Sequence, residues 1–233
     1  MASRDDSGNR CDYRRRSRYY RDGFLKMRFV DFYFDFSSTN SYFAAFLLPE
    51  ICARNDARVN WMPAHFAALF RGTSFDVMAM TPRKARYLWR DHARYAERTG
   101  LPFRKPSRFP IKTSSALRAV LAAGRTSAPA DNHDLRENAQ RAISQAFMRA
   151  YWERDEDISD RGVLASIASS AGFDGATLMD IADAKPARDE LAALTETAVV
   201  RGVFGAPTFF VGDEMFWGKD RLDFVEQWLK RPE

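Results

Sequence analysis

RFVDFYFDFSSTNSY (residues 28–42) is the stretch of sequence that decides the fold. Residues 28–36 alternate aromatic or β-branched residues with polar ones, which predicts a β-strand. Small polar residues follow, and then an apolar pattern of helical period, so we expect a helix from about residue 40 to residue 54. ARVNWMP (57–63) predicts a second strand that ends at Pro63. Two strands joined by a crossover helix lie parallel, which makes half of an α/β domain.

The central half of the chain has a different pattern. From residue 82 to residue 200 the apolar residues recur with a helical period, and no strand pattern interrupts them. Amphipathic helices are predicted over residues 82–99, 113–123, 133–152, 159–171, 174–183 and 186–200. We therefore expect a large all-α insertion after the second strand.

GVFGAPTFFVGDEMFWGKDRLDFVEQWL (202–229) returns to strands. PTFFV and EMFW predict two strands, and the two-residue GD step between them is typical of a hairpin turn. A last helix is predicted to begin at Lys219 or Asp220. The parallel unit, the helical block and this closing segment together predict a split α/β fold with an all-α insertion.

The positive charge of the chain is confined to its N-terminal end. The net charge is +5 over 233 residues, and residues 1–28 hold nine Lys or Arg and four Asp, whereas the rest holds 27 of each sign. We therefore predict no nucleic-acid partner. Residues 1–26 are expected to be a solvated, disordered tail, and Met27 is a candidate start of the folded protein.

The composition argues against a membrane, secreted, disulfide-rich or metal-binding protein. No apolar run reaches the roughly 18–20 residues of a membrane span, and the N-terminus has no apolar stretch of a secretory signal, so we expect a soluble, cytoplasmic protein. The cysteines are Cys11, in the polar tail, and Cys52, which we expect in the core. Neither a disulfide framework nor a thiolate metal cluster can form, and the three histidines lack ligand spacing, so no metal is predicted.

Two short segments could form a site. Ser38 lies where the first strand ends and its helix begins, and free backbone N–H groups and the helix dipole stabilise an anion or thiolate there. The alternative is that Ser38 is only a helix cap. The Ala206–Pro207 bond precedes a strand. It is either an ordinary trans turn or, in a thioredoxin-like arrangement, a cis-proline that faces the N-terminus of the first helix.

Four motifs carry a resemblance to a known family: VDFYFDFSSTNSY, TPRKARY, YWERDEDISD and RGVFGAPTFFVGDEMFWGKDRL. They occur in the family's order, from Met27 to the C-terminus. The chain resembles the 2-hydroxychromene-2-carboxylate isomerase and kappa-class glutathione transferase family, in the DsbA-like branch of thioredoxin folds. The resemblance implies a thioredoxin-like (DsbA-like) domain made of residues 27–65 and 201–233, and a helical insertion domain made of residues 66–200.

The resemblance also implies a glutathione site. Ser38 matches the serine whose hydroxyl hydrogen-bonds the sulfur of glutathione, and Lys84 matches the lysine that meets a glutathione carboxylate. Ala206, before Pro207, matches the residue whose backbone pairs with the cysteinyl part, and Asp220 matches the acid that receives the γ-glutamyl amine. Without the resemblance, Lys84 would be a solvated helix charge and Asp220 a helix cap.

Two positions depart from the family's usual pattern. Thr39 stands where proline follows the active serine, and Phe75 stands where an asparagine is usual. We expect the first change to relax the turn, and the second to remove a polar contact to the peptide.

The resemblance implies a glutathione-dependent cis–trans isomerase that acts on a chromene-like or benzylidene-pyruvate-like aromatic carboxylate. The aromatic MFW step (215–217) favours this activity, although aromatic residues on a hairpin also serve as core. The alternatives are a glutathione transferase or peroxidase at the same site, and a module that only binds a thiol peptide or a partner protein. Whether the chain forms a homodimer stays open.

Overall fold

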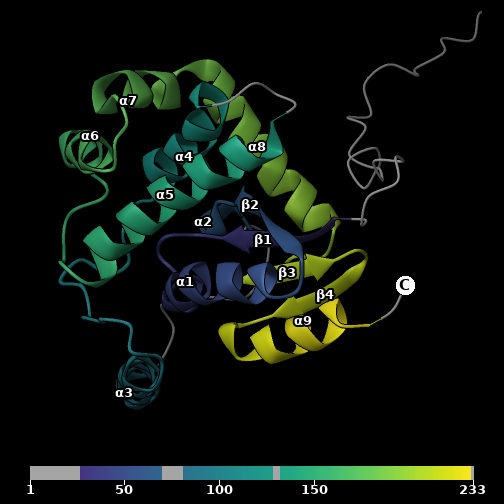
Figure 1. The fold of residues 1–233 in the computed structure, drawn as a ribbon. Coiled ribbons are helices and arrows are strands. Elements are labelled where there is room, and N and C mark those ends of the chain that lie inside the picture. The colour runs from purple at the N-terminus through teal and green to yellow at the C-terminus, as the bar shows by residue number, and fades with distance from the viewer. Residues whose placement is uncertain (1–26, 70–80, 128–131, 232–233) are drawn as a thin grey trace, which may run out of the picture.

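The fold is built on a four-stranded mixed sheet in the order β2-β1-β3-β4 (Figure 1). The computed structural model describes residues 27–69, 81–127 and 132–231, so the tail of residues 1–26 and Phe75 lie outside the described residues. β1 pairs parallel with β2, β3 pairs antiparallel with β1, and β4 pairs antiparallel with β3. The strands are β1 (Arg28–Phe34), β2 (Ala57–Pro63), β3 (Thr208–Val211) and β4 (Glu214–Trp217). The predicted strands and the parallel pairing of the first two are confirmed.

Both faces of the sheet are covered, because alternate side chains of a strand point to opposite faces. Phe32 and Phe34 of β1 are buried in the larger core, together with α1 (Thr39–Ala53) and α9 (Leu222–Leu229). Tyr33, between them, packs in a smaller core against α8 (Lys185–Val200). β1 is therefore packed on both of its faces, and the site described below lies at its C-terminal end.

A block of helices separates β2 from β3 in the chain. Besides α8, it comprises α2 (Phe66–Leu69), α3 (Pro82–Thr99), α4 (Ser114–Thr126), α5 (His133–Trp152), α6 (Arg161–Ser170) and α7 (Gly175–Asp183). The six long predicted helices are confirmed, and no strand interrupts them in the part of the chain that the structure describes. α2 was not predicted, since four residues are too few for a period to show. No described helix is both long and apolar enough to span a membrane.

The fold is therefore a thioredoxin-like α/β fold with a large helical insertion, as predicted. One hydrophobic core runs from the sheet through α1 into α4 and α5, and Cys52 is buried in it, as expected. The proposed domain boundaries, at residues 65 and 200, stay a prediction.

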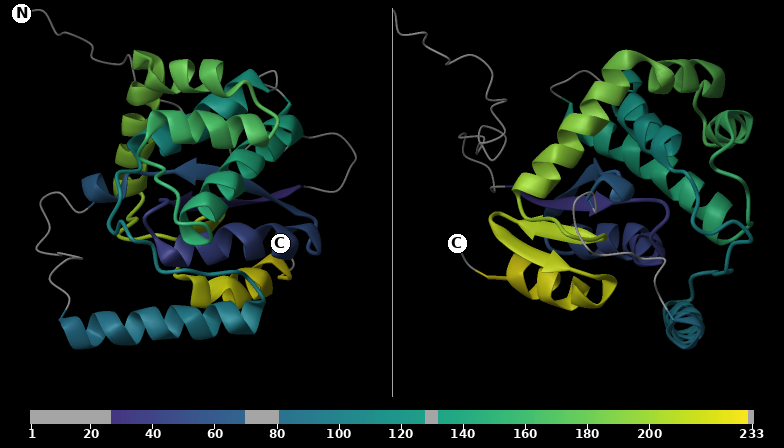
Figure 2. Two further views of the ribbon diagram at one scale, coloured as in Figure 1. Left: turned by 90° about the vertical axis from the view of Figure 1, so that its left-hand side faces the viewer. Right: turned by 180° about the vertical axis from the view of Figure 1, so that it is seen from behind.

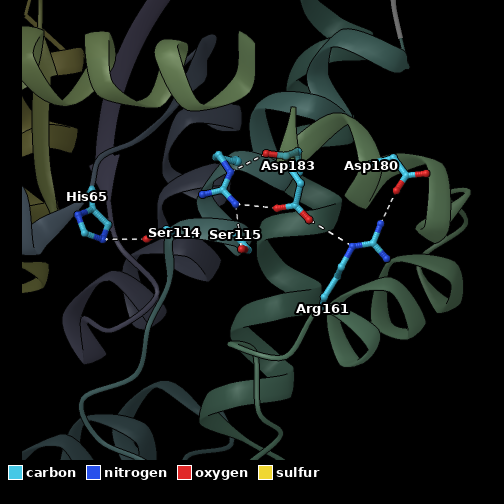
Figure 3. Close-up of polar contacts among 8 residues, drawn as sticks. His65, Ser114, Ser115, Arg161, Asp180 and Asp183 are labelled. Atoms are coloured by element: carbon cyan, nitrogen blue, oxygen red, sulfur yellow. Dashed lines mark hydrogen bonds and ion pairs between the residues drawn. The ribbon is translucent and has the colours of Figure 1, made fainter. Parts of the chain in front are cut away.

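Polar contacts hold the helical block together (Figure 3). The guanidinium of Arg118 on α4 lies 2.7 Å from Asp183 at the end of α7, and Arg161 of α6 lies 3.2 Å from the other oxygen of the same carboxylate. His65, just after β2, shares a 3.1 Å hydrogen bond with Ser114 at the start of α4. These contacts fix the start of α4 beside the end of β2.

α3 lies at the edge of the molecule (Figures 1 and 2). Of its residues only Ala96 is buried. The ring of Tyr95, near its C-terminal end, meets Phe43 of α1 with ring centres 4.8 Å apart. The C-terminal half of α3 is thus anchored to α1, whereas the residues that begin the helix are exposed.

Candidate active site

Ser38 is the N-cap of α1, and its hydroxyl is used twice. The residue has an extended backbone, with φ −91° and ψ 112°. Its Oγ accepts a hydrogen bond from the backbone N–H of Ser41 (3.2 Å) and donates one to the carbonyl oxygen of Ala206 (2.8 Å). Ser38 is therefore a helix cap, and it also joins the start of α1 to a loop 168 residues away.

The Ala206–Pro207 peptide bond is cis, as the thioredoxin-like interpretation required. β3 runs antiparallel to β1, with Thr208 opposite Tyr33, so the start of β3 lies beside the end of β1. This pairing brings the proline loop to the N-terminus of α1. Ser38 and Ala206 are both half-buried, so their contact can be reached from solvent.

Asp35 holds the loop that presents Ser38. Asp35 is 1% exposed. One oxygen accepts hydrogen bonds of 2.8 Å from the backbone N–H and the hydroxyl of Ser37, and the other accepts one of 2.9 Å from the N–H of Phe66. Asp35 was not among the predicted site residues, although an Asp side chain that accepts from the backbone N–H two residues further on is a recognised turn signal at a strand end.

The segment after β4 lies against the same loop. The N–H of Gly218 donates a 2.9 Å hydrogen bond to the carbonyl oxygen of Pro207. A short 3₁₀ helix, η3 (Lys219–Arg221), follows. Asp220 is exposed and forms an ion pair of 2.9 Å with Arg221. Asp220 therefore lies two residues after a direct contact with the cis-proline loop.

Lys219 points inward, which was not predicted. It is 8% exposed, and its Nζ donates a 3.0 Å hydrogen bond to Oδ1 of Asn40 in the first turn of α1. The ammonium also lies 4.6 Å from the ring centre of Tyr95. A lysine within the charged run GKDR normally indicates a solvated side chain, so no signal in the sequence pointed to its burial.

Lys84 lies apart from these groups. It follows Pro82 in the first turn of α3, where its N–H donates a 3.4 Å hydrogen bond to Oγ1 of Thr81. Its side chain is exposed, and within the described residues no hydrogen bond or ion pair holds it. The structure brings Ser38, Ala206 and Pro207 into one cluster, and it leaves Lys84 outside that cluster.

A groove of about 320 Å³ runs between α1, α3 and the η3–α9 segment. Lys219 and Asp220 line one part of it, and Tyr95 and Arg98 of α3 line another. Ser38 does not line it. Because its α1 residues begin at Leu47, the groove leads away from the N-terminus of that helix.

Two exposed aromatic rings flank the cis-proline loop. Phe204 and Trp217 are 51% and 52% exposed, with ring centres 5.0 Å apart. A Cβ atom added at Gly205 would lie 2.4 Å from Nε1 of Trp217, so the indole rests directly on the loop backbone. Exposed aromatic surface beside a cluster of polar groups is typical of a ligand-binding face.

A helix N-terminus capped by a serine, opposite a cis-proline loop on a β2-β1-β3-β4 sheet, defines a thioredoxin-fold protein without an active-site cysteine. Sequence comparison agrees, because the pattern of the DSBA-like thioredoxin domain matches residues 29–230. The chain belongs to the family of DsbA-like thioredoxin domains.

Two curated relatives and one solved structure are similar to the chain over most of its length. The chain is 29% identical over 202 residues to the 2-hydroxychromene-2-carboxylate isomerase of Sphingobium xenophagum, covering 86% of this chain and 97% of that protein. It is 25% identical over 219 residues to glutathione S-transferase kappa 2 of Caenorhabditis elegans, covering 87% of this chain and 92% of that protein. The solved structure of a 2-hydroxychromene-2-carboxylate isomerase superposes with a TM-score of 0.73 at 26% identity, covering 86% of this chain and 94% of that one.

Proposed function

We propose that the protein is a glutathione-dependent cis–trans isomerase of the 2-hydroxychromene-2-carboxylate isomerase type. The observation that carries the proposal is the contact between the Ser38 hydroxyl and the Ala206 carbonyl, at a helix N-terminus and beside a cis-proline. A site of this geometry suits a thiol peptide, and no cysteine of the described residues lies in it. The name of the relative in Sphingobium xenophagum supports the reaction class.

The residues present fit glutathione. The hydroxyl of Ser38 now donates to the carbonyl of Ala206, which is also the acceptor that an incoming cysteinyl N–H would need. Rotation of that hydroxyl toward a bound sulfur releases the carbonyl, so one small movement satisfies both partners. Asp220 presents a carboxylate for an ammonium group, and Lys84 an ammonium group for a carboxylate. The relative named glutathione S-transferase kappa 2 supports the choice of this tripeptide.

The roles of the protein's own groups follow from their chemistry. When bound, glutathione would supply a thiolate that adds reversibly to a conjugated double bond, which is what makes rotation about that bond fast. Ser38 holds the sulfur through one hydrogen bond and is not itself the nucleophile, because a serine hydroxyl needs a general base. The free N–H groups of the first turn of α1 stabilise the negative charge. The chain thus binds, orients and ionises the thiol.

The aromatic rings of Phe204 and Trp217 support an aromatic substrate. They border the loop that contains Ala206, and each leaves about half of its surface in solvent. A planar aromatic acid stacked on them would lie beside the sulfur position. We assign the substrate to the chromene-carboxylate class on this ground, together with the relatives' names. A glutathione-dependent reaction also suits the cytoplasm, where we place the protein.

A transferase or peroxidase activity at the same site is the second candidate, favoured by the kappa-class relative. The deciding experiment measures conversion of 2-hydroxychromene-2-carboxylate by dialysed protein, with and without glutathione. The proposal predicts turnover that requires glutathione and consumes none of it. Net consumption of glutathione would support the transferase, and glutathione binding without turnover of any substrate would support a binding module.

A further inference from the structure

Lys219 is a buried cation for which the proposed chemistry has so far given no role. Its ammonium donates a 3.0 Å hydrogen bond to the neutral Oδ1 of Asn40, and it lies 4.6 and 5.9 Å from the ring centres of Tyr95 and Phe43. Among the residues that the structure describes, no carboxylate forms an ion pair with it, and the adjacent Asp220 pairs with Arg221 instead.

Such a charge is costly to bury. An ammonium withdrawn from water without a counter-ion loses several kilocalories per mole of hydration, and one hydrogen bond with two ring contacts recovers only part of that loss. A protein that needed only the packing could use an apolar side chain there. The burial of Lys219 therefore points to a role for its charge, namely to act on an anion in its neighbourhood.

The position of Lys219 shows where that anion belongs. Asn40, which accepts from the ammonium, is two residues after Ser38 in the first turn of α1. The N–H of Gly218, directly before Lys219, donates a hydrogen bond to the carbonyl of Pro207. The backbone of Lys219 thus lies beside the cis-proline loop, and its ammonium lies at the N-terminus of α1. These two elements flank the proposed sulfur position.

We propose that the ammonium of Lys219 sets the electrostatic potential at the N-terminus of α1, so that a thiol held at position 38 is ionised near neutral pH. Lys219 acts through space and does not touch the sulfur. The proposal shares its site with the proposed function but does not require that glutathione be the ligand. At an effective dielectric constant of about 20, a unit charge roughly 10 Å away changes a pKa by about one unit.

Other charged groups near Lys219 act in both directions. On α3, Asp91 favours the protonated amine and Arg98 opposes it, and on η3 Asp220 favours it. Burial lowers the pKa of Lys219. His92 of α3 does not compete for the role, because burial lowers its pKa to about 4 and leaves it neutral.

The effect of Lys219 on a thiol at position 38 is opposed by the buried carboxylate of Asp35, which holds the loop before Ser38. A negative charge there raises the pKa of a nearby thiol. The N-terminal N–H groups of α1 and Lys219 therefore have to outweigh Asp35 for a thiolate to persist.

The test places a thiol in the chain, so no ligand is required. Ser38→Cys is made with Cys11→Ser and Cys52→Ala, and the introduced thiol is titrated by its thiolate absorbance and by its rate of alkylation against pH. Adding Lys219→Met should raise the thiol pKa by about one unit. Lys219→Arg should leave it nearly unchanged. Lys185→Met is the matched control and should have no effect, because Lys185 is 83% exposed at the start of α8.

A thiol pKa that is the same with Lys219 and with Lys219→Met, in proteins with equal circular dichroism, would overturn the proposal. If Lys219→Met does not fold, Lys219→Gln replaces it, since it keeps a donor for Asn40 and loses only the charge. An equal pKa in that variant overturns the proposal as well. Failure of wild-type protein to bind glutathione would refute the proposed function and leave this result standing, so the two can be told apart.

Discussion

The hydroxyl of Ser38 and the carbonyl oxygen of Ala206 are joined by a 2.8 Å hydrogen bond across 168 residues of chain. This bond uses the proton of the Ser38 hydroxyl, and the backbone N–H of Ser41 donates to the oxygen of the same hydroxyl. A ligand that accepts a hydrogen bond from the Ser38 hydroxyl must replace the bond to Ala206. The bond from the N–H of Ser41 can stay. Ser38 is therefore expected to contribute more to catalysis than to stability.

Ser38→Ala tests this expectation. The change removes one hydrogen bond to a thiolate, worth on the order of 1.5–3 kcal/mol, so turnover should fall roughly tenfold to a hundredfold. The pH at half-maximal rate should rise, because the bound thiol loses a stabilising donor. Steady-state rates across a pH series, with glutathione affinity from fluorescence titration, measure both effects.

The matched control is Ser41→Ala. Ser41 lies in the same helix turn, and its buried Oγ has no hydrogen-bond partner in the part of the chain that the structure describes. Its removal should leave the rate and the pH profile unaltered. If Ser38→Ala behaves like Ser41→Ala, then Ser38 is only a helix cap and its assignment is wrong.

The protein should not reduce disulfides. Ser38 and Ser41 occupy the two ends of the S-T-N-S step, where a redox protein of this fold needs cysteines, and they cannot form a disulfide. Cys52 is buried, and burial raises the pKa of its thiol to about 12, so it is not reactive. Insulin reduction should be absent both in wild-type protein and in the Cys11→Ser, Cys52→Ala variant. Activity that survived in the variant would contradict this expectation.

Trp217→Ala should weaken binding of the aromatic substrate more than binding of glutathione. Loss of a stacking face is worth roughly 0.5–1.5 kcal/mol beyond the buried area, so KM for the aromatic acid should rise about threefold to tenfold. The affinity for glutathione should change little. Phe224→Ala is the control, because Phe224 is also 52% exposed but lies on α9. Equal effects of the two substitutions would show that Trp217 has no special role.

Glu226 should stabilise the fold at neutral pH and lose this effect in acid. Its carboxylate receives hydrogen bonds of 2.9 and 2.7 Å from Arg54, which ties α9 to the end of α1. That guanidinium holds the pKa of Glu226 well below its ordinary value. A lowered folded-state pKa stabilises the protein above the unfolded pKa of about 4.3, and the stabilisation is lost as the pH falls through the folded-state pKa.

Glu226→Gln should therefore lower Tm at pH 7 by about 2–4 °C, since a well-aligned pair at the surface contributes up to about 1 kcal/mol. The difference from wild type should shrink as the pH is lowered below about 4. Thermal unfolding followed by circular dichroism between pH 3 and 7 measures both trends, with the exposed Glu196→Gln as control. A Tm difference that is independent of pH would exclude the ionic origin.

Much of the fold could be predicted because its signals are local. The alternation in residues 28–36 and 57–63 and the helical periods after residue 82 depend only on neighbours a few positions apart. The four motifs then pointed to Ser38 and Pro207 as parts of one site. α2 was missed because four residues carry no measurable period.

The sequence by itself determined the order and kind of the elements other than α2, the family, and the presence of a serine where a redox protein of this fold has a cysteine. Only the tertiary structure decided which of the predicted residues meet. Insertion of β3 beside β1 brings Ala206 to Ser38, while Lys84 lies in the first turn of α3, whose ring contacts with α1 come from its C-terminal half. The burial of Lys219 against Asn40 likewise requires three packed elements at once, namely η3, α1 and α3. No local pattern records such a contact, because it depends on residues 179 positions apart.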